Sequence, residues 1–276
     1  MQLSARSVYG TLEHLDQQLK EHKRVFYTRF GDGEIYIMQG KGTIDHAPAP
    51  ELTAEIKKVF AIEHPQFLKA VSVNYPRERG MVDGVFAPFP DNDALEQALL
   101  QMGEKPGTVY DNFISFHYLS LFDQQRMQSF LDQHIRPKRK MFIGSSDKRV
   151  LEYVFGKIDV YVQLPGRDAF YTLDEWFPKV REQLEGVDVV LPAAGAATKV
   201  VQRLLWESGA PVHSIDMGSV ADVVQQRGTR RWIRLLGHRS RKIMLPGWQQ
   251  SGLFKQSPVR DVKQELKYLF HKLRAR

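Results

Sequence analysis

The sequence predicts an α/β fold in which a mostly parallel, Rossmann-like sheet is flanked by helices and followed by a basic C-terminal helix. Between residues 140 and 218, short apolar strands alternate with helical segments three times, and small or polar residues follow each strand. Units of this kind build parallel sheets with right-handed crossovers. The 276 residues contain no low-complexity linker. We therefore expect a single domain over 1–276, in which 259–276 is the basic helix.

The first half of the chain supplies helices and strands in turn. Leucine and valine recur at helical spacing over 7–22, and aromatic and β-branched residues over 24–30 predict a strand. Further helices are expected at 48–62, 93–102 and 123–134, and a short strand at 70–74. The residues from 80 to 93 are rich in Gly, Pro and Asp and predict a loop. The aromatic segment 108–122 fits a helix and a strand equally well.

The second half has a more regular rhythm. Strands are expected at 140–144, 158–165, 187–195 and 211–218, and helices at 145–156, 173–184 and 196–209. Gly209 ends the last of these helices as a C-terminal cap.

Composition narrows the classes of function. The formal net charge is +7 and the pI about 9.4, a balance that favours anionic partners such as nucleic acid, phospholipid or phosphorylated small molecules. The absence of cysteine excludes disulfides, thiolate chemistry and cysteine-ligated zinc. Neither a signal peptide nor an apolar run of 18 residues is visible. We expect a soluble, cytoplasmic protein.

The tail, 259–276, combines an apolar stripe with six lysine and arginine residues. One interpretation is a terminal helix docked on the core. The other is a peripheral contact with anionic lipid at the inner face of the membrane.

Glycine-containing turns follow several of the predicted strands. They contain Gly31, Gly144, Gly195 and Gly218. In parallel sheets ligands bind beyond the carboxyl ends of the strands, and free backbone N–H groups at the starts of helices can hold phosphate. No turn has the P-loop or the GxGxxG pattern. Each turn alone also fits a plain strand-to-helix connection, but together they predict a ligand site.

Two carboxylates and an arginine surround the first of these turns. On extended backbone Asp32 and Glu34 would point to the same side, where two oxygen ligands suit Mg²⁺ or Mn²⁺. Arg29 could hold a phosphate through its planar fork. The alternative is an Asp-Gly turn with a helix-capping Glu34, in which Arg29 pairs with one of the carboxylates.

Three segments carry a family resemblance. "RFGDGE" (29–34), "LPGRDAF" (164–170) and the stretch from "VLPAAG" to "SIDMGS" (190–219) resemble the GT-D-type glycosyltransferases, bacterial sugar-nucleotide-dependent enzymes with a DXE metal motif. The resemblance spans roughly 25–230. It implies a Rossmann-like fold that binds a nucleoside diphosphate sugar, with Asp32 and Glu34 as the DXE carboxylates.

The function implied is metal-dependent transfer of a hexose, most simply from a UDP-sugar, to a glycan or lipid-linked acceptor in bacterial surface polysaccharide or glycoprotein synthesis. The cofactor would be Mn²⁺ or Mg²⁺. The residues expected to bind the nucleotide sugar are Arg29, Gly31, Gly33, Asn74, Gly144, Ser145, Ser146, Lys148, Gly195, Thr198, Gly218, Ser219 and Arg230.

The acceptor hydroxyl also requires a base, for which Asp222, Asp216 and His117 are candidates. Some members of the family carry a His after the DxG sequence; here Ser219 takes that place. Two alternatives remain from the residues alone. One is another metal-dependent phosphate enzyme, a phosphohydrolase or nucleotidyltransferase. The other is a basic nucleic-acid-binding protein, which only the high pI favours. Because the sequence contains no recognised nucleic-acid-binding signature, no nucleic-acid partner is expected.

Overall fold

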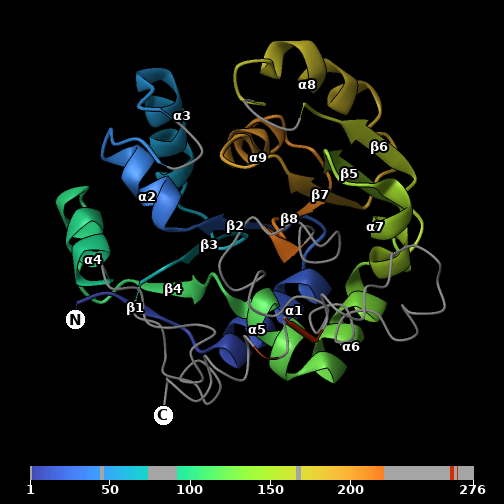
Figure 1. Cartoon of the computed structure of the whole chain (residues 1–276), viewed down its shortest axis with the longest axis horizontal. Coiled ribbons are helices and arrows are strands. Elements are labelled where there is room, and N and C mark those ends of the chain that lie inside the picture. The colour runs from blue at the N-terminus through green and yellow to red at the C-terminus, as the bar shows by residue number, and fades with distance from the viewer. Residues whose placement is uncertain are drawn as a thin grey trace.

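The protein forms one parallel sheet of eight strands among the residues that the computed structural model describes, which are 2–43, 47–73, 92–165, 169–220, 262, 263 and 266. The strand order is β1-β4-β3-β2-β8-β7-β5-β6, and every pairing is parallel (Figure 1). The strands are β1 (Ser4–Ala5), β2 (Phe26–Phe30), β3 (Phe67–Val71), β4 (Val109–Asn112), β5 (Lys140–Gly144), β6 (Val160–Gln163), β7 (Val189–Ala193) and β8 (His213–Ile215).

Helices cover both faces of the sheet (Figure 1). They are α1 (Val8–Glu21), α2 (Asp32–Met38), α3 (Pro50–Phe60), α4 (Asn92–Gln101), α5 (Ser115–Phe122), α6 (Gln124–His134), α7 (Lys148–Phe155), α8 (Leu173–Glu182) and α9 (Ala197–Glu207). One core packs α1, α5, α6 and α7 against the sheet, and a second packs α2, α3, α4, α8 and α9 against the other face. Every residue of β2 and β5 is buried, as expected for central strands covered on both sides.

The predicted α/β class and parallel sheet are confirmed, whereas some boundaries differ. The strand expected at 70–74 is β3, which starts earlier because Phe67 and Leu68 pair with the first residues of β2. The ambiguous segment 108–122 contains both a strand and a helix: β4 ends at Asn112, and α5 begins three residues later at Ser115. The two-residue strand β1, beside β4, was not predicted.

The C-terminal helix expected at 259–276 lies outside the described residues except at 262, 263 and 266, which are helical. The loop expected at 80–93 also falls almost entirely outside them. Of the helices that the structure describes, none is both long and apolar enough to cross a bilayer.

Candidate functional site

The carboxyl ends of β2, β8, β7 and β5 lie next to one another in the sheet. Because these strands are parallel, the segments that follow them emerge at the same edge. In the register, Tyr27 is opposite Ile215, and Gly144 is opposite Ala193. The turns that the sequence predicted to form a site are therefore neighbours.

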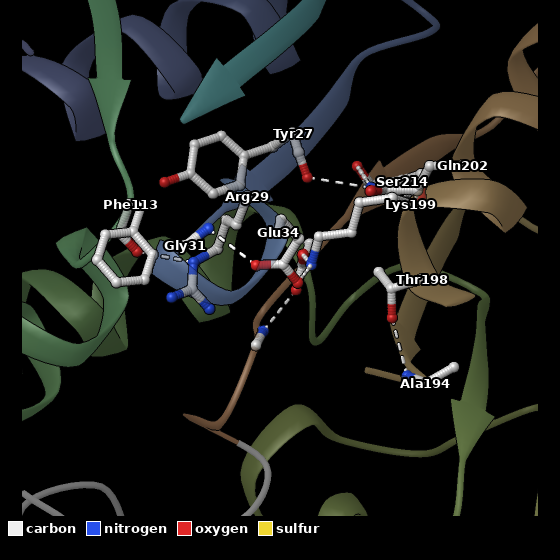
Figure 2. Close-up of polar contacts among 12 residues, drawn as sticks. Tyr27, Arg29, Gly31, Glu34, Phe113, Ala194, Thr198, Lys199, Gln202 and Ser214 are labelled. Atoms are coloured by element: carbon white, nitrogen blue, oxygen red, sulfur yellow. Dashed lines mark hydrogen bonds and ion pairs between the residues drawn. The ribbon is translucent and has the colours of Figure 1, made fainter. Parts of the chain in front are cut away.

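Arg29 is the central cation of this edge (Figure 2). It lies near the end of β2 with only 5% of its surface exposed. Its Nε donates a hydrogen bond to the carbonyl oxygen of Phe113 at 2.7 Å, and its guanidinium carbon lies 4.8 Å from the centre of the Phe113 ring. Its Nη2 lies 3.4 Å from Nδ1 of His117. The segment between β4 and α5 thus fixes the position of the guanidinium.

Gly218 makes room for that guanidinium. A Cβ at this position would lie 1.4 Å from Nη1 of Arg29 and 2.6 Å from its Cζ. The backbone φ of Gly218 is +55°, in the left-handed region that glycine adopts readily. At Gly218 of the "DMG" sequence after β8, the backbone therefore comes close to the buried guanidinium of Arg29.

No carboxylate in the described part of the chain forms an ion pair with Arg29. Two acidic groups of this edge, Glu34 and Asp216, pair with Lys199 instead. A buried charge without a counter-charge is costly, so an arginine in this position is suited to receive an anion.

Lys199, in the first turn of α9, joins the two acidic groups. Its Nζ lies 3.1 Å from Oε1 of Glu34 and 2.9 Å from Oδ2 of Asp216, and the lysine is 6% exposed. Oδ1 of Asp216 accepts a hydrogen bond from the N–H of Gly218 at 2.7 Å. The α2 start, α9 and the end of β8 are thereby connected by one ammonium group.

The charges of this triad stabilise one another. Burial alone would raise the pKa of Glu34, but the charge and hydrogen bond of Lys199 and the N–H of Gly31 hold that pKa below its usual value. Burial alone would lower the pKa of Lys199, but Asp216 and Glu34 hold it above its usual value. Glu34 and Lys199 are therefore both charged at neutral pH.

The predicted acidic pair has a different geometry from the one expected. Asp32 and Glu34 do not lie on extended backbone, because α2 begins at Asp32. Two positions apart on a helix are about 200° apart around its axis, so the two side chains point in different directions. Glu34 also caps the helix by accepting a hydrogen bond from the N–H of Gly31 at 2.9 Å. Glu34 therefore caps the helix, as the alternative interpretation of the sequence expected, while Arg29 forms no ion pair with Asp32 or Glu34.

A metal ion therefore does not fit the predicted pair as such. Both oxygens of Glu34 already have partners, Lys199 and the N–H of Gly31. Asp32 is half-buried at the first position of α2, and its carboxylate has no such partner among the described residues. Those residues contain no group of three or more His, Asp or Glu side chains arranged to hold a metal. Of the predicted pair, only Asp32 has a carboxylate without such partners among the described residues, and the Mn²⁺ or Mg²⁺ cofactor stays a prediction.

His117 and Ser219 adjoin the arginine. His117 comes from α5, on the opposite face of the sheet from α2 and α9, and is 3% exposed. Its Nε2 lies 3.0 Å from Oγ of Ser219, which is half-buried just beyond Gly218. Two predicted site residues that are 102 positions apart in sequence are thus in direct contact.

The turns after β5 and β7 form a second part of the edge, and the buried Lys199 follows the second of them in α9. Gly144 packs closely, since a Cβ there would lie 3.1 Å from the carbonyl oxygen of Ala193. Oγ1 of Thr198 accepts a hydrogen bond from the N–H of Ala194 at 2.8 Å (Figure 2). Gly195 has a φ of +59°. Lys148 is directed along its own helix, with Nζ 3.7 Å from Oε1 of Glu152.

The remaining predicted residues divide into two groups. Asn74, Asp222 and Arg230 lie outside the described residues. Gly33, Ser145 and Ser146 are present at the edge; at Gly33 the nearest atom to an added Cβ is 3.9 Å away, so space does not require a glycine there. Their proposed contacts with a nucleotide sugar stay predictions.

The sequence reasoning missed the two residues that organise the site. Lys199 was visible as a lone basic residue inside the apolar run "AATKVV", a pattern that indicates a buried and paired cation. Phe113 was one aromatic among many, and nothing in the sequence pointed to its carbonyl oxygen as the partner of Arg29.

Comparisons with known proteins give a fold but no sequence relative. No family model matches the sequence, and no curated protein matches it significantly. A solved structure of a glycosyltransferase (DUF1792) from Streptococcus sanguinis superposes with a TM-score of 0.65 at 16% identity, covering 95% of this chain and 97% of that chain. The fold is shared. Another structure, of domain of unknown function 1792, is described as having a distinct glycosyltransferase fold and has a TM-score of 0.59 at 14% identity, covering 95% of this chain and 94% of that chain.

Proposed function

We propose that this protein is a glycosyltransferase that moves a hexose from a nucleotide-diphosphate sugar, most simply a UDP-sugar, to a glycan or lipid-linked acceptor of the bacterial surface. The observation that carries the proposal is Arg29 at the carboxyl edge of the sheet, a buried guanidinium that forms no ion pair with a carboxylate of the described residues. Ligands of parallel sheets bind at this edge, and a planar guanidinium matches the oxygens of a diphosphate. The fold shared with a DUF1792 glycosyltransferase supports the same class of reaction.

In such a reaction the bond between the anomeric carbon and the diphosphate breaks, and negative charge develops on the leaving oxygen. A donor that is fixed before the reaction stabilises that charge without having to reorganise. The contacts of Arg29 with the carbonyl oxygen and ring of Phe113 hold the guanidinium in this way. Arg29 therefore binds the diphosphate and stabilises it as it leaves.

The charged residues described at this edge carry no positive excess to offset a diphosphate. Arg29 and Lys199 are offset by Glu34 and Asp216, and Asp32 adds a further negative charge. This excess supports a role for Mn²⁺ or Mg²⁺, which Asp32 would hold together with phosphate oxygens and water. When bound, such an ion supplies additional charge stabilisation for the leaving group.

The basic C-terminal segment supports a lipid-linked acceptor. Val262 and Leu266 lie four positions apart on helix and are 60% and 62% exposed. An exposed apolar pair within a basic segment is suited to a membrane surface carrying anionic lipid. We include peripheral attachment to the inner face of the membrane in the proposal.

Thermal shift measurements with UDP-, GDP- and CMP-sugars, with and without Mn²⁺, test the proposal. One nucleotide sugar should raise the Tm more in the presence of Mn²⁺, and Asp32→Asn should abolish the Mn²⁺-dependent part while leaving the Tm without ligand unchanged. Sugar transfer to a glycan acceptor should follow for the same donor.

Other outcomes separate the alternatives. Phosphate release without sugar transfer would indicate a phosphohydrolase, and steeply salt-dependent binding of DNA or RNA without any response to nucleotide sugars would indicate a nucleic-acid-binding protein.

A further inference from the structure

Three described side chains form a continuous chain of hydrogen bonds across the site. Nη2 of Arg29 lies 3.4 Å from Nδ1 of His117, and Nε2 of His117 lies 3.0 Å from Oγ of Ser219. Arg29 and His117 are 5% and 3% exposed, whereas Ser219 is only half-buried. The chain thus runs outward from a buried cation to a hydroxyl that a ligand can reach.

The chemistry of the three groups fixes the direction of each bond. A guanidinium carries only donors, so Nδ1 of His117 must accept from Arg29. An imidazole with an unprotonated Nδ1 carries its proton on Nε2 when neutral, so Nε2–H donates to Oγ of Ser219. Ser219 then accepts from His117, and its own proton is left to donate elsewhere.

We propose that Arg29, His117 and Ser219 form a one-directional relay that makes the Ser219 hydroxyl a hydrogen-bond donor to an anionic oxygen of the diphosphate. The inference rests on the proposed function, since it takes the diphosphate as the ligand of Arg29. No proton is transferred: the relay orients and polarises the hydroxyl. Arg29 and Ser219 thereby present donors to the same anion from the ends of β2 and β8.

His117 is a positioning residue in this arrangement. Its lone-pair nitrogen faces the guanidinium, and its other nitrogen is a donor, so the imidazole does not take a proton from Ser219. The role predicted for His117 from the sequence, a base for the acceptor hydroxyl, would need the lone pair that Arg29 occupies.

Binding of inorganic pyrophosphate to the full-length chain in the presence of Mn²⁺, measured by titration calorimetry, tests the relay. His117→Leu and Ser219→Ala should each weaken binding about tenfold, the size expected for a hydrogen bond to a charged group. The double variant should bind no more weakly than either single variant, because both changes remove the same donor. His117→Gln should bind within about threefold of wild type, since an amide can accept from Arg29 and donate to Ser219.

His64→Leu is the matched control, because His64 is exposed and precedes β3, at the opposite edge of the sheet. It should leave pyrophosphate binding unchanged, and the Tm of each variant reports whether it folds. Additive losses for His117→Leu and Ser219→Ala, or wild-type binding by both, would overturn the relay. Failure of the wild-type protein to bind pyrophosphate would instead remove the proposed function.

Nitrogen-15 NMR of the imidazole tests the direction independently of any ligand. The relay requires the proton of neutral His117 to be on Nε2. Assignment of the proton to Nδ1 would overturn the relay even if pyrophosphate binds.

Discussion

The sheet edge has two halves, one at the ends of β2 and β8 (the charged half) and one at the ends of β5 and β7 (the uncharged half). Both are built from a strand, a glycine turn and a helix, but their turns surround different kinds of side chain. At the ends of β2 and β8 the turns enclose buried charges, Arg29 and Asp216, and Lys199 reaches Asp216 and Glu34 from α9. At the ends of β5 and β7 the turns contain small uncharged residues, and Thr198 satisfies a backbone N–H within its own turn. The comparison teaches that one turn pattern can either give space to a buried charge, as Gly218 does for Arg29, or close a tightly packed strand-to-helix connection, as Gly144 does.

The largest effect should come from the charged half, where Lys199→Met would leave Glu34 and Asp216 buried and close together without their cation. We expect a loss of about 3–5 kcal/mol in the free energy of unfolding, measured by urea denaturation. Lys20→Met, which removes an exposed pair with Asp16, should cost less than about 1 kcal/mol. Equal losses in the two variants would show that the triad is not the stronger element.

Arg29→Met should abolish most of the stabilisation of the diphosphate. We expect kcat/KM for sugar transfer to fall about 10²–10³-fold, equivalent to about 2.7–4 kcal/mol, because the guanidinium acts where charge develops. Arg149→Met, at an exposed position at the start of α7 in the uncharged half, is the control and should keep wild-type activity. Undiminished turnover in Arg29→Met would contradict the assignment of the site to the charged half.

Gly218→Ala tests whether space for the guanidinium is the reason for the glycine. The added methyl group would overlap Nη1 of Arg29, so pyrophosphate affinity should fall about tenfold or more as the guanidinium is displaced. Gly209→Ala, at a φ of +72° but with no atom within 4 Å of an added Cβ, carries a similar backbone strain without the overlap. If both variants bind pyrophosphate alike, strain rather than space explains the position.

The pH dependence of stability tests the pairing of Glu34 with Lys199. Because the folded pKa of Glu34 is lowered, its contribution is complete above the unfolded value of 4.5 and is lost as the pH falls through the lower folded value. Glu34→Gln should flatten this part of the curve of unfolding free energy against pH. An unchanged slope below pH 4.5 would show that Glu34 is not stabilised by Lys199.

The smallest effect is expected for Thr198→Val in the uncharged half. Loss of the hydroxyl leaves the N–H of Ala194 without its partner and should cost about 1–3 kcal/mol of stability. Pyrophosphate affinity should change less than twofold. A larger loss of affinity would support the prediction from sequence that Thr198 contacts the donor.

Much of this fold could be predicted from the sequence, because each strand and helix has its own apolar period. The strands of the second half were placed within a few residues, and their parallel arrangement followed from the alternation with helices. The boundary within segment 108–122 could not be predicted because aromatic and aliphatic residues recur along it without a clear period, so that the pattern does not separate β4 from α5.

The site was less accessible to this reasoning. Arg29 and Gly218 were identified, but their contact joins residues 189 positions apart and depends on strand order, which local patterns do not contain. Asp32 and Glu34 were assigned to extended backbone because "GDGE" has the composition of a turn. Instead, a helix begins at Asp32, where the side chain of Glu34 accepts a hydrogen bond from the N–H of Gly31. Such a cap depends on residues three positions apart, which the composition of "GDGE" alone does not reveal.

The single ammonium of Lys199 has a consequence for how a ligand would be received. It ties the first turn of α2 to the end of β8 from within α9, so three separate segments are held in register before anything binds. Little conformational entropy is then lost when an anion arrives, and its binding energy is not consumed in assembling the site. We expect the backbone of the charged half to be nearly the same in the free and liganded protein.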